Sequence, residues 1–96
     1  MTNMFIRYCV ATEKWNDATV EDRKAYHTKL KESAKENGFE LLLFGPSFGV
    51  IESPAWVLRS EKTFDDYNKW LGTATRIGPR YFSASRTVFL VDAPWV

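Results

Sequence analysis

The sequence has few of the residues that build covalent or metal-bound frameworks. Its 96 residues include one cysteine and one histidine. One cysteine cannot form a disulfide within the chain, so nothing in the sequence requires an oxidising compartment. A lone histidine without a cysteine pair or a tight carboxylate cluster gives no zinc pattern. We therefore expect no metal site, no cofactor and a cytoplasmic protein.

An excess of one charge and long apolar runs are also missing. The sequence has thirteen Lys and Arg residues and twelve Asp and Glu residues, which gives a net charge of +1. A near-neutral chain argues against a nucleic-acid partner, because phosphate contacts need a basic face. No apolar run approaches the roughly 20 residues that span a bilayer, and the N-terminal segment has no apolar stretch of signal-peptide length. We therefore expect no membrane partner.

Aromatic residues, by contrast, are abundant. Phe, Trp and Tyr make up 16% of the chain, and four of them are tryptophans. That is more ring surface than a small monomer hides easily. No stretch rich in Pro, Gly or Ser divides the chain, and no repeat or low-complexity segment occurs. Residues 1–96 are therefore expected to form a single domain.

Hydrophobic spacing and breaker residues predict the element order β-α-β-β-α-β. A capping pattern at Thr19 and a stop at Gly38 bound the first helix, while Thr63 and Gly72 bound the second. Runs rich in β-forming residues predict the strands. The predicted strands are 4–12, 39–44, 55–60 and 81–92; the predicted helices are 19–37 and 64–71, with a short extended piece at 48–51 and a tail from residue 92.

This order is typical of the ferredoxin-like α+β arrangement, a four-stranded antiparallel sheet with two helices on one face. The other face would be bare in a monomer. It cannot be polar, because we expect Leu41 and Leu43 on one face of their strand and Leu42 and Phe44 on the other. Leaving such side chains exposed forgoes ~1.5–3 kcal/mol for each. The sequence therefore predicts a homodimer in which the bare face meets a second copy across a two-fold axis.

The element order, the strands that are apolar on both faces, and the passage from strand to helix between Trp56 and Tyr67 resemble the dimeric α/β-barrel superfamily. The resemblance covers Phe5 to Val91. It implies two ferredoxin-like subunits whose sheets press together into a barrel with the helices outside. The superfamily includes cofactor-free monooxygenases, haem-degrading proteins, muconolactone-isomerase-like enzymes, stress-response proteins and many members of unknown activity.

The resemblance implies two functions of different kinds. The first is a cofactor-independent monooxygenase, in which a base removes a proton from a hydrophobic or aromatic substrate held between sheet and helices. The second is a non-catalytic ligand-binding or stress-associated dimer with the same cavity. Haem binding is a minor alternative. So is an RNA-recognition-like module, for which Phe48-Gly49 matches only two positions of the RNA-binding motif.

His27 is the candidate base, because it alone titrates near neutrality and shares helical spacing with Leu30 and Ala34. The alternatives are an axial ligand to haem iron, a partly buried histidine bonded to a neighbour, or a residue facing water. Cys9, which lies among apolar strand residues, is expected to be an inert buried thiol.

Three arginines lie inside predicted strands. An inward-facing arginine needs an anionic partner, either a substrate carboxylate, phenolate or enolate or an ion pair within the protein. Arg86 is the candidate anion stabiliser, because strand alternation places it on the same face as Val88, which is expected to point into a buried space. Arg7 shares parity with Phe5 and Cys9. The arginines are Arg7, Arg59 and Arg86, and the carboxylates that offer ion pairs are Glu40, Glu52 and Asp92.

Aromatic residues with a polar atom are the candidate walls of a pocket for a flat organic ligand. We select Trp56, Trp70 and Tyr81 as substrate-binding residues. Asn68, together with Trp70, Tyr81 and Arg86, is of the types that monooxygenases of this superfamily place around a phenolic substrate. The alternative is that these rings are core. The segment 72–80 offers either a phosphate cradle or a surface connection.

Overall fold

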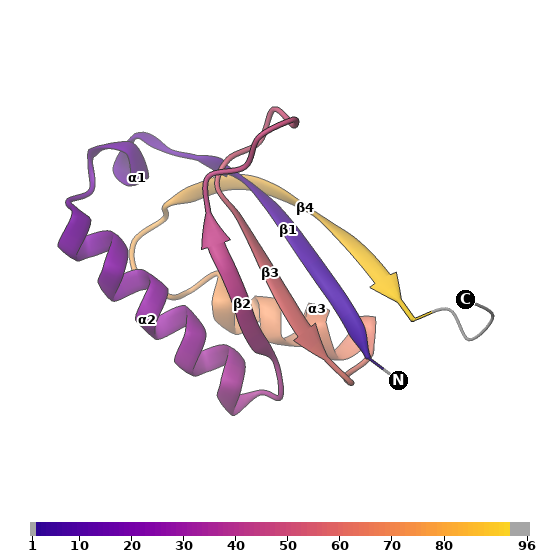
Figure 1. Cartoon of the computed structure of the whole chain (residues 1–96). Helices are drawn as coiled ribbons and strands as arrows, with labels where there is room; N and C mark the ends of the chain where they lie inside the picture. The colour runs from indigo at the N-terminus through magenta and orange to yellow at the C-terminus, as the bar shows by residue number, and fades with distance from the viewer. Residues whose placement is uncertain (1, 93–96) are drawn as a thin grey trace.

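The computed structural model describes residues 2–92, which form four strands and three helices (Figure 1). The strands make one antiparallel sheet in the order β2-β3-β1-β4. This α+β architecture is consistent with the predicted small ferredoxin-like fold. The predicted tail beyond Asp92 lies outside the described residues. The elements are β1 (Asn3–Ala11), α1 (Glu13–Asp17), α2 (Val20–Glu36), β2 (Glu40–Gly45), β3 (Ala55–Ser60), α3 (Phe64–Ala74) and β4 (Phe82–Val91).

The two long helices begin where the sequence predicts. The Thr19 hydroxyl accepts a hydrogen bond from the backbone N–H of Asp22 at 3.1 Å. Thr63 and Asp66 form a reciprocal capping box, in which each side chain accepts from the other residue's backbone N–H at 3.2 Å. Such caps satisfy backbone donors that the first helical turn leaves unpaired. The local chemistry of the chain therefore fixes both helix starts.

Three features differ from the sequence prediction. The short helix α1 is additional, because five residues are too few to give a periodic signal. Helix α3 continues through Gly72 to Ala74, so the predicted stop is wrong; one glycine inside a helix costs only about 1 kcal/mol. Residues 48–51 lie in the loop between β2 and β3, with bends at 49–51, and do not form an extended piece.

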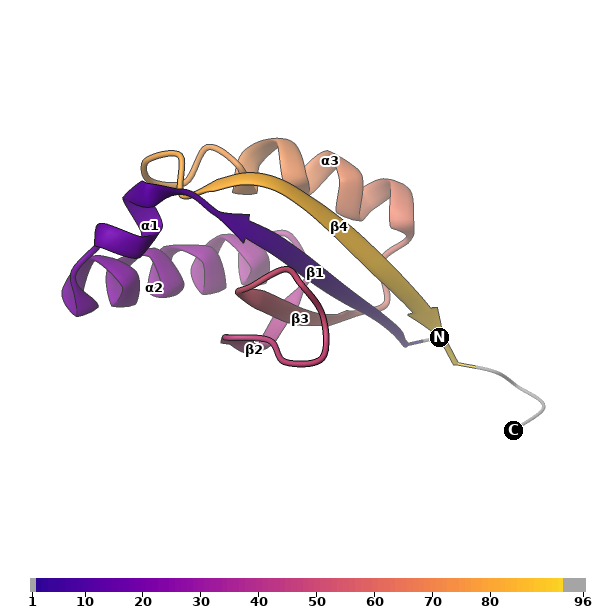
Figure 2. The same cartoon turned by 90° about the horizontal axis from the view of Figure 1, so that it is seen from above.

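Helices α2 and α3 cover one face of the sheet, here called the helix side, and leave the opposite open face uncovered (Figure 2). At one end of the helix side, aromatic rings pack closely. The Phe5 ring stacks on Tyr67 and Phe89, with centroids 4.5 and 4.9 Å apart, and Phe39 stacks on Trp70 at 5.3 Å. We call these five residues the closed cluster.

The polar atoms of the closed cluster are all paired. The Tyr67 hydroxyl and the Thr87 hydroxyl share a hydrogen bond of 2.8 Å. The Trp70 indole Nε1–H donates to the Ser33 hydroxyl at 3.1 Å. Because buried donors are costly when unpaired, these two bonds allow large amphipathic rings to serve as core.

An irregularity in β2 decides which leucines face the helices. Leu41 pairs with Leu58, and Leu43 pairs with the adjacent Val57, so the register shifts around Leu42. Leu41 is buried on the helix side, whereas Leu43 is 69% exposed. The prediction that Leu41 and Leu43 share a face is therefore wrong, because the extra residue at the shift reverses the alternation.

The open face has an apolar centre. The strand registers align Leu43, Val57, Ile6 and Val88 in one row that crosses all four strands. Directly opposed residues in an antiparallel sheet point to the same face, so these four side chains lie together. The expectation that this face is not polar is therefore confirmed for the centre of the sheet.

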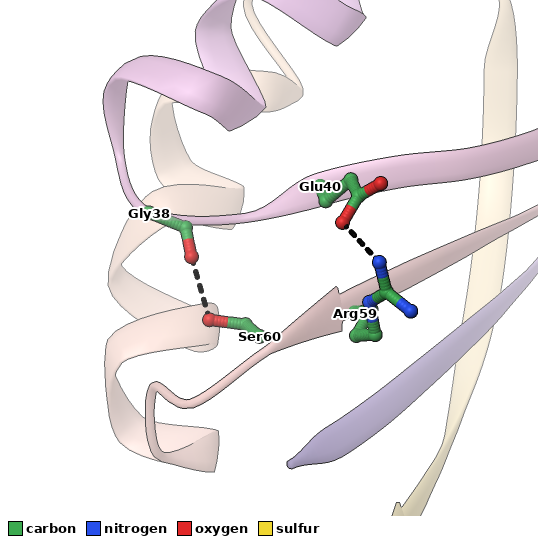
Figure 3. Close-up of polar contacts among 4 residues, drawn as sticks. All are labelled: Gly38, Glu40, Arg59 and Ser60. Carbon is green, nitrogen blue, oxygen red and sulfur yellow. Dashed lines mark hydrogen bonds and ion pairs between the residues drawn. The ribbon is translucent and has the colours of Figure 1, made fainter.

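The end of β3 shows how adjacent residues serve opposite faces (Figure 3). Arg59 donates to the carboxylate of Glu40 at 2.7 Å, and both side chains are about half exposed. The next residue, Ser60, is buried and its hydroxyl donates to the backbone carbonyl of Gly38 at 2.6 Å. The ion pair borders the apolar centre of the open face, while the Ser60 bond ties β3 to the turn after α2.

Candidate functional site

A cavity of about 490 Å³ opens on the helix side where β4 begins. The end of α3 and the following loop form its mouth, and four elements supply its walls. Aromatic walls with a few polar groups are typical of small-molecule sites. We call it the β4 cavity. The side chains that matter most in it are Arg7 from β1, Tyr26 from α2, Trp56 from β3, and Tyr81, Phe82 and Ser85 from the β4 segment.

The mouth of the β4 cavity is held by backbone contacts. The Thr12 hydroxyl lies 2.9 Å from the carbonyl oxygens of both Arg80 and Tyr81, and the Thr12 N–H donates to the Tyr81 carbonyl at 2.8 Å. Gly78 has φ +67°, and a Cβ added there would lie 3.6 Å from the rings of Tyr26 and Tyr81. The loop 75–80 therefore joins the end of β1 to the cavity wall, with a glycine where the backbone is left-handed.

Arg7 is a partly buried cation in this cavity. It extends from β1 on the helix side, and its Cζ lies over the Trp56 ring, 5.6 Å from the ring centroid. Across residues 2–92 no carboxylate forms an ion pair with Arg7. No Asp, Glu or His is among the described residues that line the cavity. A cation that is partly removed from water gains from a counter-ion, so this site favours a negatively charged group.

The indole of Trp56 is a second group without a partner. Trp56 is 2% exposed, and its Nε1–H has no hydrogen-bond acceptor among the described residues. A buried donor left unpaired costs roughly 1–3 kcal/mol. Oδ1 of Asn3 is also buried without a donor, but Asn3 lies at the opposite end of β1. The β4 cavity therefore combines an unpaired cation with an unpaired neutral donor.

The titratable groups beside Arg7 hold their protons at neutral pH. Burial raises the pKa of the Tyr26 phenol. Burial also raises the pKa of the Cys9 thiol to about 11. The Arg7 charge opposes both pKa shifts but does not cancel them. Neither group is a general base at pH 7, so this arrangement is better suited to hold an anion than to remove a proton.

Among the predicted wall residues, the structure brings Trp56 and Tyr81 together in the β4 cavity. Trp70 belongs to the closed cluster instead, where it is 3% exposed and does not line the cavity. Asn68 is exposed on α3 and lies outside the cavity lining. Trp70 and Asn68 therefore fall outside the site, because α3 turns Trp70 toward α2 and Asn68 toward solvent.

His27 is exposed, so the prediction that it lies on the inward face of its helix is wrong. The buried residues of α2 are Tyr26, Leu30 and Ala34, which are spaced four residues apart. The buried face therefore includes Tyr26 and not its neighbour His27. The His27 ring lies 5.2 Å from the Phe44 ring, beside a separate hollow of about 510 Å³ between α2 and the end of β2. His27 does not line the β4 cavity.

Arg86 faces the open side of the sheet rather than a buried space. It pairs with Tyr8 across β1 and β4, and its Cζ lies 4.6 Å from the Tyr8 ring centroid. Its Nε donates to the Glu52 carboxylate at 2.7 Å. The alternative that this arginine forms an ion pair within the protein is therefore confirmed, and Arg86 does not reach the β4 cavity.

Four of the six principal cavity residues are missing from the set selected from sequence, and two of them, Arg7 and Tyr26, carry a detectable signal. Arg7 is one of three strand arginines, and the sequence analysis selects Arg86 instead of it. Its shared parity with Phe5 and Cys9, which are both buried, is the signal that distinguishes it. Tyr26 is detectable from its i, i+4 spacing with Leu30 on α2.

Neither a protein-family model nor a curated protein matches this chain. Within residues 2–92, no helix has the length and apolar character needed to cross a membrane. The same described residues contain no group of three or more side chains that could hold a metal ion. The geometry of the β4 cavity is therefore the basis for assigning a function.

Proposed function

We propose that this protein is a homodimer of the dimeric α/β-barrel type that binds a hydrophobic or aromatic small molecule in the β4 cavity. The cavity itself is the observation that supports this function. It lies between sheet and helices, has a volume of about 490 Å³, and is walled by Trp56, Tyr81 and Phe82. Ring faces of this kind bind flat organic molecules through stacking and apolar contact.

Binding without reaction is the function that the cavity favours. Cofactor-independent oxygenation needs a base that removes a substrate proton. His27 lies beside a different hollow, and burial raises the pKa of Tyr26, so neither supplies that base in the β4 cavity. The non-catalytic ligand-binding dimer is therefore proposed ahead of the monooxygenase.

The second copy is proposed on the open face of the sheet. The row from Leu43 to Val88 gives this face an apolar centre, and ion pairs of Arg59 and Arg86 border it. An apolar centre with a polar rim is the usual anatomy of a protein interface. A two-fold axis would place the same patch of each subunit against the other.

A negative charge at Leu43 tests the assembly. Leu43→Asp should convert the dimer to a monomer in native mass spectrometry, with unchanged helix content by circular dichroism, because Leu43 is exposed in the single chain. Thr28→Asp, on the exposed surface of α2, is the matched control and should remain a dimer. A wild-type monomer, or a Leu43→Asp dimer, would contradict the proposed interface.

Filling the cavity tests ligand binding. Isothermal titration with 2-naphthoate and its neutral amide should show one site per chain for at least one compound. Ser85→Trp places a large ring in the cavity lining and should weaken binding by about tenfold or more, equivalent to at least ~1.4 kcal/mol. Asn68→Trp adds the same ring on the exposed side of α3 and should bind normally. Equal binding by both variants would place the ligand elsewhere.

A further inference from the structure

The β4 cavity also indicates the charge of its ligand. We infer that the ligand is an aromatic or conjugated acid, whose carboxylate, phenolate or enolate oxygen pairs with the Arg7 guanidinium. This inference rests on the proposed ligand-binding function and adds the chemical class of the ligand. The partly buried Arg7, which has no ion pair among the described residues, supports it together with the aromatic lining of the cavity.

The three strand arginines differ in whether they have an ion-pair partner, and the least solvated of them has none. Arg59 and Arg86 each have a carboxylate at 2.7 Å, although both arginine side chains are about half exposed. Exposed pairs contribute little, because water already stabilises the charges. Arg7 is the least solvated of the three and has no ion pair among the described residues. The cation that most needs a partner is the one that faces the cavity.

The Cys9 thiol and the Tyr67 hydroxyl lie within hydrogen-bonding reach of the Arg7 guanidinium group, but its five N–H donors outnumber these two neutral partners. The Trp56 ring contacts the guanidinium group at 5.6 Å, and the N–H donors of a guanidinium lie in the plane of the group. That planar fork matches the two oxygens of a carboxylate. Arg80 at the mouth adds a second positive charge, and no acidic residue among the described lining residues opposes either. The cavity is therefore electrostatically complementary to an anion.

The remaining walls define the rest of the ligand. Trp56, Tyr81 and Phe82 supply ring faces, and the Trp56 Nε1–H lacks an acceptor. That nitrogen is itself buried, so a ligand in the cavity would meet the ring of Trp56 rather than this donor. The lining also carries the hydroxyls of Thr75 and Ser85. A flat apolar body with an acidic group matches these features, whereas a neutral hydrocarbon does not.

Pairs of acids and amides test the inference. Benzoate, 2-naphthoate and indole-3-acetate, each with its own amide, are titrated calorimetrically into the wild-type protein at pH 7. At least one acid should bind about tenfold or more tightly than its amide. Arg7→Met should abolish this preference while binding of the amide persists. Arg76→Met removes an exposed charge from the same loop, outside the cavity lining, and should keep the preference.

Each other result has a definite meaning. Equal binding of acids and amides by the wild type would overturn the anion inference and leave the binding function standing. Binding of none of the six compounds would overturn both. A preference that survives in Arg7→Met but is lost in Arg80→Met would overturn the role of Arg7. If Arg7→Met does not fold, the wild type decides: acid affinity must fall with added NaCl while amide affinity stays constant, and parallel behaviour overturns the inference.

Discussion

The two ends of the helix side use the same kinds of residue for different purposes. In the closed cluster, the Tyr67 hydroxyl and the Trp70 indole are both hydrogen-bonded, and the rings stack closely. In the β4 cavity, the Trp56 indole has no partner, and Arg7 has no counter-ion among the described residues. Both regions are rich in aromatic side chains, yet only one completes its own polar contacts.

This difference separates structural rings from ring surfaces that are available to a ligand. An abundance of Trp and Tyr predicts neither role, because both roles need apolar area with one polar atom. The hydrogen-bond partner of that atom distinguishes them. Natural cores leave few buried donors unpaired, and among the described residues the Trp56 indole is one of the exceptions.

The largest effect should come from truncating a ring in the closed cluster. Tyr67→Ala should lower the free energy of unfolding by about 3–5 kcal/mol, because Tyr67 is fully buried and well packed. Tyr81→Ala should cost about half as much, since Tyr81 already borders empty space. Urea unfolding measures both changes. Equal losses for the two variants would contradict the distinction between the two regions.

A smaller effect should appear at high pH. Burial raises the pKa of Cys9 to about 11, so the native state holds the thiol proton more tightly than the unfolded chain does. The free energy of unfolding is therefore little affected by this group below pH ~9 and falls by about 3 kcal/mol as pH rises through 11. Urea titrations at pH 8, 9, 10 and 11 measure this slope.

Cys9→Ala is the control for the pH effect, and its slope should be shallower than that of the wild type. The buried tyrosines, Tyr26 and Tyr67, have raised pKa values and add a loss of the same sign in both proteins at the highest pH. Identical slopes for wild type and variant would show that water reaches Cys9 from the neighbouring cavity.

Replacing each tryptophan with phenylalanine sharpens the comparison. Trp70→Phe breaks the bond to Ser33 and leaves a void, so it should cost about 2 kcal/mol. Trp56→Phe removes a donor that has no partner, which offsets part of the lost packing, and should cost about 1 kcal/mol. The two variants are compared by urea unfolding. A greater loss for Trp56→Phe would show that its indole N–H is already satisfied.

The smallest effect is expected at His27. His27→Gln should change the free energy of unfolding by no more than about 0.5 kcal/mol, because the residue is exposed and only its ring contacts Phe44. Affinity for aromatic acids should also be unchanged. A loss of roughly 2 kcal/mol would indicate a structural role, and a loss of acid binding would connect His27 to the β4 cavity.

Much of the fold can be predicted from the sequence, because caps and breakers act locally. Strand β3 is found at its predicted residues, and both long helices begin at their predicted threonine caps. The short helix α1 escapes prediction because five residues give no periodic signal, and the register shift at Leu42 escapes it because the shift depends on pairing with β3. That shift alone reverses the face on which Leu43 lies.

The candidate site is predicted less completely. Trp56 and Tyr81, which the sequence analysis selects as pocket walls, both line the β4 cavity, whereas Arg7 is considered from the sequence but not selected. Whether a strand arginine has a carboxylate partner depends on residues far away in the chain, as with Arg86 and Glu52. Only the three-dimensional structure shows which arginine remains unpaired beside a cavity.

The most direct test of this account follows the indole N–H signals of Trp56 and Trp70 by NMR. A ¹H–¹⁵N correlation spectrum, assigned with the two Trp→Phe variants, is recorded while 2-naphthoate is added. The account predicts that the Trp56 signal shifts strongly as the ligand packs against the Trp56 ring, while the Trp70 signal stays in place. Binding that leaves Trp56 unchanged, or that moves Trp70 instead, would contradict it.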